Sequence, residues 1–299
     1  MNTSEYDAFG PWIYQVRSAE EVPRLFRGFE LDLESTRLVL KVPREIERRN
    51  ATPSMDLYDR LLIAGDDGLT VLTRVGSVYS ESRIDYSSIV IIEDSVSLLD
   101  GRLTVFTSDG RRLVIPYNAT SRSLVARLVD LLRVESHANT SGGQRCFDFA
   151  ALPTPGRDEL GLDDVSIPSE YRELLRLEPD LEYFGGYGRT RLDPIGGRLT
   201  HALHRLMPAV LHGAIVCGTQ DELQLLSRRE WLVRSRVPVL SSARTVVRLS
   251  TVDSVTAQKH PAYSGADVVT VRAGAALLGL ITPPDSIVER TLLSIARKR

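Results

Sequence analysis

Histidines come closest to a catalytic arrangement in this sequence. His201 and His204 stand three residues apart, and His212 follows eight residues later. Positions i and i+3 share one face of a helix, so two imidazoles on a helix could meet one metal ion. No aspartate or glutamate lies between Arg198 and His212 to complete a ligand set. We therefore expect solvated or packed histidines, and no metal site.

Sequence signatures of common catalytic sites are not found. There is no Gly-x-Ser-x-Gly, no P-loop and no His-Glu-x-x-His. The glycine-rich residues 185–189 are not flanked by the strand-to-helix switch of a dinucleotide site, so turn glycines explain them better. The sequence thus predicts a non-enzymatic protein without a cofactor. A metal-dependent hydrolase that uses His201 and His204 is the enzymatic alternative.

A first group of arginines could bind an acidic partner. It consists of Arg44, Arg48 and Arg49, and two glutamates, Glu45 and Glu47, interrupt it. On the helix that residues 43–49 suggest, i, i+4 pairs between these side chains would neutralise much of the charge.

The second group of arginines is denser. It contains Arg228, Arg229, Arg234 and Arg236 around the apolar residues that begin at Trp231. Alternation along a strand would project Arg234 and Arg236 from one side. This group could contact an acidic surface, either of a partner or of the acidic middle segment of the same chain.

Charge is unevenly distributed along the chain. The net charge of −2 gives no overall attraction to nucleic acid or to an anionic membrane. Residues 134–209 hold 12 acidic and 8 basic side chains, whereas residues 210–299 hold 7 acidic and 12 basic ones. The basic C-terminal segment makes peripheral binding to anionic membrane lipid the alternative to a protein partner.

Cysteine usage and hydropathy indicate a compartment. Cys146 and Cys217 lie far apart and form no Cys-x-x-Cys pattern, which argues against a disulfide framework or a zinc ribbon. The N-terminus is polar and acidic, and no apolar run approaches the roughly 18 to 20 residues that span a bilayer. We predict a cytoplasmic protein.

Short strands followed by one helix are predicted in residues 59–133. Apolar runs alternate with turns at residues 65–68, Asp100-Gly101 and Asp109-Gly110, which predicts about seven strands. The period then changes, because Leu124, Leu128, Leu131 and Leu132 form the stripe of an amphipathic helix. Thr120 or Ser121 is the expected N-cap of this helix.

Residues 210–299 repeat this plan. Strand-like runs lead to a helix with a stripe at Ile287, Val288, Leu292 and Ile295. Gly101 and Gly110 are 9 residues apart, as are Gly265 and Gly274. Ile89 precedes Leu124 by 35 residues, and Val252 precedes Ile287 by 35. Matched spacings in the same order indicate an internal duplication.

The other segments are less regular. Residues 137–144 are a linker candidate, residues 169–177 a short helix, and residues 198–211 a further helix. The N-terminal residues 1–58 contain one strand, predicted at residues 36–42, and we expect them to pack on the first repeat.

Strands with Asp-Gly turns and one final helix resemble the pleckstrin-homology-like domains of bacteria. The resemblance is closest over residues 57–133, where Ile84-Asp-Tyr-Ser-Ser-Ile, Leu99-Asp-Gly-Arg-Leu and Asp109-Gly-Arg-Arg-Leu match the core pattern of that family. Residues 211–299 match by spacing more than by identity. Together the two regions cover about 160 of 299 residues.

The resemblance implies an α+β, mostly β fold with two antiparallel barrels, each closed by a C-terminal helix. Its best-known members bind phosphoinositide headgroups through basic residues near the first hairpin. Here that hairpin carries Asp66-Asp67, and the second copy carries Asp221-Glu222, which would repel a polyphosphate.

The expected organisation is an N-terminal lead-in (1–58), a first domain (59–133), a linker with a helical segment (134–209) and a second domain (210–299). The expected function is a scaffold that binds a protein partner.

Overall fold

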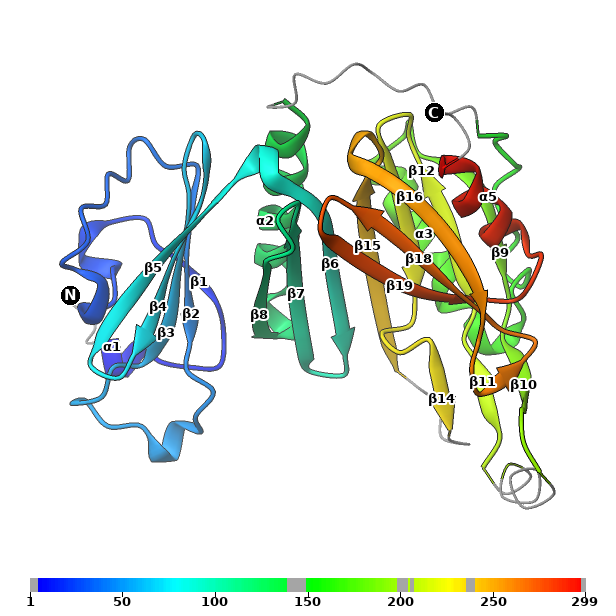
Figure 1. The fold of residues 1–299 in the computed structure, drawn as a ribbon. Helices are drawn as coiled ribbons and strands as arrows, with labels where there is room; N and C mark the ends of the chain where they lie inside the picture. The colour runs from blue at the N-terminus through cyan, green and yellow to red at the C-terminus, as the bar shows by residue number, and fades with distance from the viewer. Residues whose placement is uncertain (1–4, 139–148, 198–203, 205–206, 235–239, 297–299) are drawn as a thin grey trace. The chain divides into compact units, whose positions relative to one another are not determined.

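The computed structural model describes residues 5–138, 149–197, 204, 207–234 and 240–296 (Figure 1). The chain is an α+β protein that is mostly β, as predicted, with several antiparallel sheets. Among the described residues these sheets are open, so the expected closed barrels do not form. A barrel requires its end strands to pair with each other, and here the end strands of each sheet do not.

Residue contacts divide the chain into two compact units. Unit 1 comprises Met1–Ile89, Leu99–Leu103 and Val114–Thr140, and unit 2 comprises Val90–Leu98, Thr104–Leu113 and Ser141–Arg299. The strands β7 (Asp100–Thr107) and β8 (Arg112–Asn118) contribute residues to both units. The linear four-segment division stays a prediction.

Unit 1 contains a five-stranded antiparallel sheet in the order β1-β2-β3-β4-β5. These strands are β1 (Tyr14–Gln15), β2 (Leu38–Pro43), β3 (Tyr58–Ala64), β4 (Gly68–Val75) and β5 (Val78–Asp85). The strands predicted near residues 36–42, 60–64 and 69–73 are confirmed. The prediction omitted β5, because its centre, Ser-Glu-Ser-Arg, has no apolar residue to create an alternating pattern.

One face of this sheet is covered by the N-terminal segment. That segment holds α1 (Glu5–Ala8) and the 3₁₀ turns η1 (Ala19–Glu21) and η2 (Arg24–Phe26). The core includes Phe26, Leu57 and Leu61, each almost fully buried. The helix suggested for residues 43–49 does not form, because Pro43 ends β2 and only the 3₁₀ turn η3 (Arg48–Asn50) follows.

The helix α2 (Arg122–Ala138) is confirmed at the predicted place. It follows η5 (Ala119–Ser121), where the Asn118 side chain accepts a hydrogen bond from the Thr120 N–H. Its buried stripe is Val125, Leu128, Val129 and Leu132, which is rotated slightly from the predicted one. Within unit 1, Arg37 of the segment before β2 pairs with Glu135 of α2.

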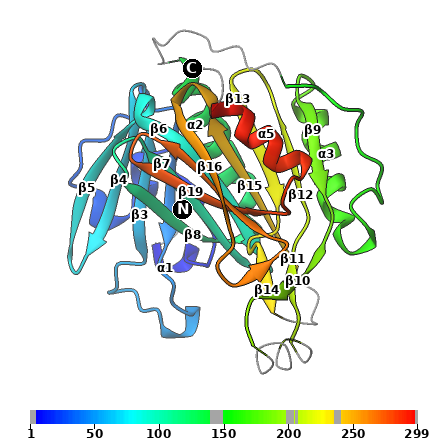
Figure 2. The ribbon, with the colours of Figure 1, turned by 45° about the vertical axis from the view of Figure 1, so that its right-hand side comes forward.

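The main sheet of unit 2 has the order β6-β15-β13-β12-β9, with antiparallel neighbours. These strands are β6 (Ile89–Ser97), β15 (Ser241–Arg248), β13 (Glu222–Ser227), β12 (Ala214–Gly218) and β9 (Glu182–Tyr187). A second sheet has the order β16-β18-β19, formed by β16 (Val252–Lys259), β18 (Asp267–Ala273) and β19 (Ala276–Thr282). Figure 2 shows these three strands crossing in front of β15 and β13.

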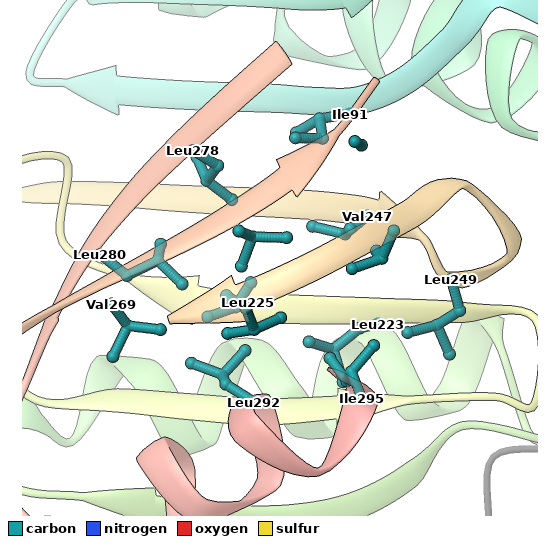
Figure 3. Close-up of a cluster of buried hydrophobic side chains, with 14 of the residues drawn as sticks. Ile91, Leu223, Leu225, Val247, Leu249, Val269, Leu278, Leu280, Leu292 and Ile295 are labelled. Carbon is teal, nitrogen blue, oxygen red and sulfur yellow. The ribbon is translucent and has the colours of Figure 1, made fainter. Parts of the chain in front are cut away.

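The core of unit 2 lies between its two sheets. Figure 3 shows Leu223, Leu225 and Val247 of the main sheet facing side chains of β18 and β19. The helix α5 (Ile287–Ala296) closes this core with Val288, Leu292 and Ile295, which confirms the predicted stripe.

A small sheet, in the order β14-β11-β10-β17, continues three strands of the main sheet beyond a bend. It consists of β10 (Thr190–Pro194), β11 (Ala209–Leu211), β14 (Leu232–Arg234) and β17 (Tyr263–Ser264). Gly213 lies at this bend, where a Cβ atom would come within 2.8 Å of the Tyr187 carbonyl oxygen. Glycine is therefore required for the close approach of the two chain segments.

The middle segment is partly helical. The short helix predicted over residues 169–177 is confirmed as α3 (Ser166–Leu177), which follows the 3₁₀ turn η6 (Leu162–Asp164). The end of the helix predicted over residues 198–211 is instead the strand β11. Residues 198–203 and 205–206 lie outside the described residues.

Both halves of the chain share the order of elements that leads to their final helix. A strand of eight residues is followed by a three-residue 3₁₀ turn, further strands and the helix. The 3₁₀ turns are η4 (Tyr86–Ser88) and η7 (Leu249–Thr251). Each residue of β5 has a counterpart 163 positions later in β15, because Val78–Asp85 and Ser241–Arg248 have the same length and precede these turns directly.

Candidate functional site

The strand β5 lies at one end of the sheet of unit 1 and is largely exposed. β5 pairs with β4 along its whole length, from Gly68↔Asp85 to Val75↔Val78. Its other edge has no strand partner among the described residues, because β5 ends the sheet (Figure 1). Six of its eight residues are exposed, and within the strand Ile84 alone is buried. An edge of this kind can accept another strand.

Local sequence explains how β5 is held while its edge stays open. Gly76 adopts a positive φ of 66°, which gives the two-residue turn between Val75 and Val78. The Tyr79 ring packs edge-on against Phe26, with centroids 5.7 Å apart, and Ile84 anchors the far end. The polar centre between these anchors therefore faces solvent on both sides of the sheet.

The direction of the backbone groups follows from the turn. Val75 and Val78 flank a two-residue loop, so they form a hydrogen-bonded pair, and bonded and non-bonded pairs alternate from there. The N–H and C=O groups of Tyr79, Glu81 and Arg83 therefore face the open edge. Arg83 also lies 3.3 Å from Asp85 and 3.8 Å from Asp67, measured between the charged atoms.

The counterpart strand β15 has both edges occupied. It pairs with β13 on one side and with β6 on the other, over seven positions from Ser241↔Ser97 to Val247↔Ile91. Opposite charges face each other in this second pairing at Arg244↔Asp94. Two strands in equivalent places thus differ in whether a further strand covers them.

Arg44 and Arg48 line a cavity of about 870 Å³ in unit 1, together with Asp59, Arg60 and Arg74. Arg74 donates to Asp59 at 2.7 Å, and Arg44 donates to the Asp56 carbonyl at 3.2 Å. Arg60 donates to the Val114 carbonyl, and burial lowers its pKa.

Arg48 donates to two carbonyl groups, those of Tyr6 and Phe9, and its guanidinium stacks over the Tyr6 ring. The arginines that line the cavity therefore hold neighbouring segments of unit 1 together. None of the described residues that line it carries a thiol or an imidazole that could act as a nucleophile or base. Arg49, the third member of the first group, lies on the surface beside Glu47.

Arg228 is buried, which the sequence did not indicate. Its guanidinium lies 3.6 Å from Asp164 and donates to the Ser241 carbonyl at 2.8 Å. Asp164 is fully buried, and Arg189 approaches the same carboxylate at 3.5 Å. Asp164 belongs to the middle segment, residues 134–209, but this is one buried ion pair of Arg228, and the contact of the whole arginine group with an acidic surface stays a prediction.

The remaining members of the second group are dispersed. The Arg229 backbone N–H donates to the Ser241 hydroxyl at 3.3 Å. Arg234 donates to the Tyr263 hydroxyl at 2.6 Å and stacks over that ring. Arg236 lies outside the described residues. The structure therefore does not gather the described members into one exposed patch.

The histidines do not converge where they are described. His201 lies outside the described residues, and His204 contacts the Leu192 carbonyl through Nε2 at 2.6 Å. His212 is buried at the bend between β11 and β12. Burial, together with Arg189 and Arg228, lowers its pKa to about 4, against the opposing effect of Asp164. No group of three or more metal-ligating side chains occurs in the described part of the chain.

Comparisons with known proteins add no relative: no protein-family model, no curated protein and no solved structure matches this chain. In the described ranges, every helix is too short or too polar to cross a bilayer.

Proposed function

We propose that this chain is a non-enzymatic interaction protein that binds a protein partner by strand addition at β5. The observation that carries the proposal is the contrast between two equivalent strands. β15 is paired on both edges, whereas the outer edge of the eight-residue strand β5 has no strand partner in the part of the chain that the structure describes. In strand addition the partner backbone supplies the hydrogen bonds, and side chains of the strand supply selectivity.

The repeated order of elements supports the same proposal. A strand of eight residues, a three-residue 3₁₀ turn, further strands and a final helix occur in both halves, and the sequence resembles pleckstrin-homology-like domains. We propose that the two halves derive from such a module with open sheets. Its role is to present strand edges, because the acidic hairpin at Asp66 and Asp67 disfavours a polyphosphate ligand.

Part of the positive charge of the C-terminal segment is engaged inside unit 2. Arg228 and Arg248 are buried, and Arg244 donates to Glu178 at 2.6 Å and to Gln224 at 3.0 Å. Lipid attraction requires cations at the surface, which the buried Arg228 and Arg248 do not supply. Arg234, Lys259, Arg272 and Arg290 are exposed, so binding to anionic lipid stays the alternative proposal.

A peptide selection tests strand addition directly. The full chain is used to select binders from a displayed library of random extended peptides, and Arg83→Pro is compared with Arg83→Ala. Proline removes an outward N–H and obstructs the edge, while alanine keeps the N–H. We expect binding to Arg83→Pro to be at least about tenfold weaker, with Arg83→Ala close to the original chain.

Circular dichroism of both variants establishes that β5 remains folded. Peptides that bind the proline variant as tightly as the original chain would show that the partner site lies elsewhere.

A further inference from the structure

The cavity of about 870 Å³ in unit 1 has the size of a small-molecule site, because such sites measure roughly 300 to 1,000 Å³. Its lining residues come from the N-terminal segment, from β2, β3 and β4, from the start of β7 and from the end of β8. All of them belong to unit 1. The cavity is therefore a feature of one compact unit.

Arg60 and Thr73 face this cavity side by side. Arg60 pairs directly with Val42 of β2 and with Thr73 of β4. Directly opposite residues of an antiparallel sheet share one face, with their Cβ atoms about 4.5 to 5.5 Å apart. All three residues line the cavity. This row across three strands therefore presents a guanidinium and a hydroxyl group to the cavity.

Both polar groups keep hydrogen-bonding capacity. Arg60 donates through Nη1 to the Val114 carbonyl, and this is its single acceptor in the part of the chain that the structure describes. Its Nε and Nη2 atoms are left to bind a further acceptor. The Thr73 hydroxyl likewise has no partner among the described residues. A guanidinium fork next to a hydroxyl is an arrangement that binds an oxyanion.

Positive charge is in excess among the half-buried side chains of the cavity. Asp59 accepts a hydrogen bond from Arg74 at 2.7 Å and lies 3.9 Å from Arg44, so one carboxylate serves two guanidinium groups. Arg60 has no ion pair with any described residue. Burial lowers the pKa of Arg60, and Asp59 opposes this effect only in part. An anion beside Arg60 would supply the countercharge.

Three further carboxylates line the cavity, those of Glu45, Glu47 and Asp100, but these residues are exposed. Glu47 also pairs with Arg49 on the surface. Water and salt screen exposed charges much more strongly than half-buried ones. The half-buried arginines therefore determine the sign of the charge that the cavity favours.

Apolar side chains form much of the remaining wall. They are Phe9, Val42, Ile46, Leu99, Pro116 and Tyr117. Leu99 is 62% exposed, so it gains from contact with an apolar ligand that removes its surface from water. A ligand that matches both parts of the wall carries one anionic group next to an apolar body.

We propose that this cavity binds a small organic acid, with the anionic group on Arg60 and Thr73 and the apolar body against Leu99 and Ile46. The site goes beyond the proposed function, because it does not depend on strand addition at β5. Both parts of the ligand contribute, so an inorganic anion and an uncharged aromatic compound should each bind more weakly than an organic acid.

Two fluorescent probes of similar shape test this proposal on the full chain. Anilinonaphthalene sulfonate carries an anionic group on an apolar body, and phenylnaphthylamine has the apolar body alone. We expect the sulfonate to bind one site per chain, about tenfold more tightly than the uncharged probe. Inorganic phosphate should not displace it at similar concentrations.

Substitution of Arg60 locates the anionic group. Arg60→Met keeps an apolar stem without the charge, so it should weaken the sulfonate about tenfold and leave the uncharged probe unchanged. Arg60→Lys keeps the charge and should retain most of the affinity. Arg17→Met is the control, because Arg17 is an exposed arginine of unit 1 that does not line the cavity, and should change neither affinity.

Substitution of Leu99 locates the apolar body. Leu99→Glu places a negative charge on the wall and should weaken the sulfonate about tenfold. Its side chain is already exposed, so the fold tolerates the change. Leu162→Glu makes the same change at a leucine that is 84% exposed in unit 2 and should leave both affinities unchanged.

Circular dichroism establishes that each variant is folded. The proposal would be overturned by an uncharged probe that binds as tightly as the sulfonate, or by equal affinities of Arg60→Met and Arg17→Met for the sulfonate. Displacement by inorganic phosphate at similar concentrations would also overturn it. Should Arg60→Met fail to fold, Leu99→Glu decides, since an unchanged affinity of that variant places the ligand elsewhere.

Discussion

β5 and β15 hold the same place in the repeated order of elements, yet β5 ends its sheet and β15 lies inside one. Their sequences reflect this difference position by position. Arg83 corresponds to the buried Val246, and Ser82 corresponds to the buried Thr245. Charged and hydroxyl side chains keep an exposed edge from pairing indiscriminately, whereas a covered strand needs apolar contacts. The comparison shows that the same strand position is buried where another strand pairs with its outer edge, as in β15, and exposed where none does, as in β5.

Proline should give the largest difference in stability between the two strands when it replaces Val246 in β15 or the equivalent Arg83 in β5. Val246→Pro removes a ladder hydrogen bond from a strand paired on both sides, and we expect a loss of at least about 3 kcal/mol in unfolding free energy. Arg83→Pro removes a donor that faces the open edge and should cost within about 1 kcal/mol. Urea denaturation measures both values. Equal losses would mean that the outer edge of β5 is covered.

Acid should destabilise the unit that contains β15 through His212. The unfolded imidazole takes up its proton near pH 6.5, whereas the folded one does so only near pH 4. The unfolded state therefore binds more protons between these values, and stability falls as the pH drops through this window, by about 3 kcal/mol in total.

Trp231 lies in unit 2, and its backbone carbonyl accepts a hydrogen bond from the backbone N–H of His212. Its fluorescence in a Trp12→Phe background therefore follows the unfolding of that unit. His212→Gln should flatten the pH dependence. An unchanged slope in this variant would assign the acid sensitivity to other groups.

Arg244 in β15 and Glu81 in β5 occupy corresponding positions, and their replacement by alanine should change stability by different amounts. Arg244→Ala removes the donors to Glu178 and to Gln224, whose side chain is fully buried, and should cost about 2 kcal/mol. Its counterpart Glu81→Ala sits on the exposed edge and should change stability by less than about 0.5 kcal/mol. Thermal unfolding at low protein concentration compares the two. A large effect of Glu81→Ala there would show that β5 is covered within one chain.

A substitution in the turn before β5 should give the smallest change in stability that can still be measured. Gly76 has a φ of 66° and open space around its Cα, so Gly76→Ala meets backbone strain and no clash. We expect a loss of about 1 kcal/mol. Gly156→Ala is the matched control, because Gly156 also has open space but an ordinary φ, and should be neutral. A neutral Gly76→Ala would show that the turn does not require this conformation.

Much of the fold was accessible from local patterns. The stripes ending in Leu132 and Ile295 place α2 and α5, and their periodicity reports which helix face is buried. Turn glycines with matched spacing reveal the repeated order of elements. Such signals act over a few residues, so they need no knowledge of the partner segment. β5 escaped this approach because a strand exposed on both faces has no alternation, although the turn at Gly76 could have signalled it.

The candidate site was harder to predict from the sequence than the fold. Arg44 and Arg48 do line a cavity, but the sequence did not show that carbonyl groups occupy their donors. Arg228 was expected on a surface and is buried against Asp164, which lies far away in the chain. Burial of a charge depends on the other segments that surround it, and no local pattern reports those.

The sequence by itself determined the helices α2, α3 and α5 and the strands with apolar side chains, because turns, caps and apolar periodicity are local. Only the tertiary structure decided that β6 pairs with β15 while β5 keeps an open edge. Alternation along a strand specifies the face that is buried, but any edge presents the same N–H and C=O groups. The choice of partner is therefore made by the packing of the whole chain.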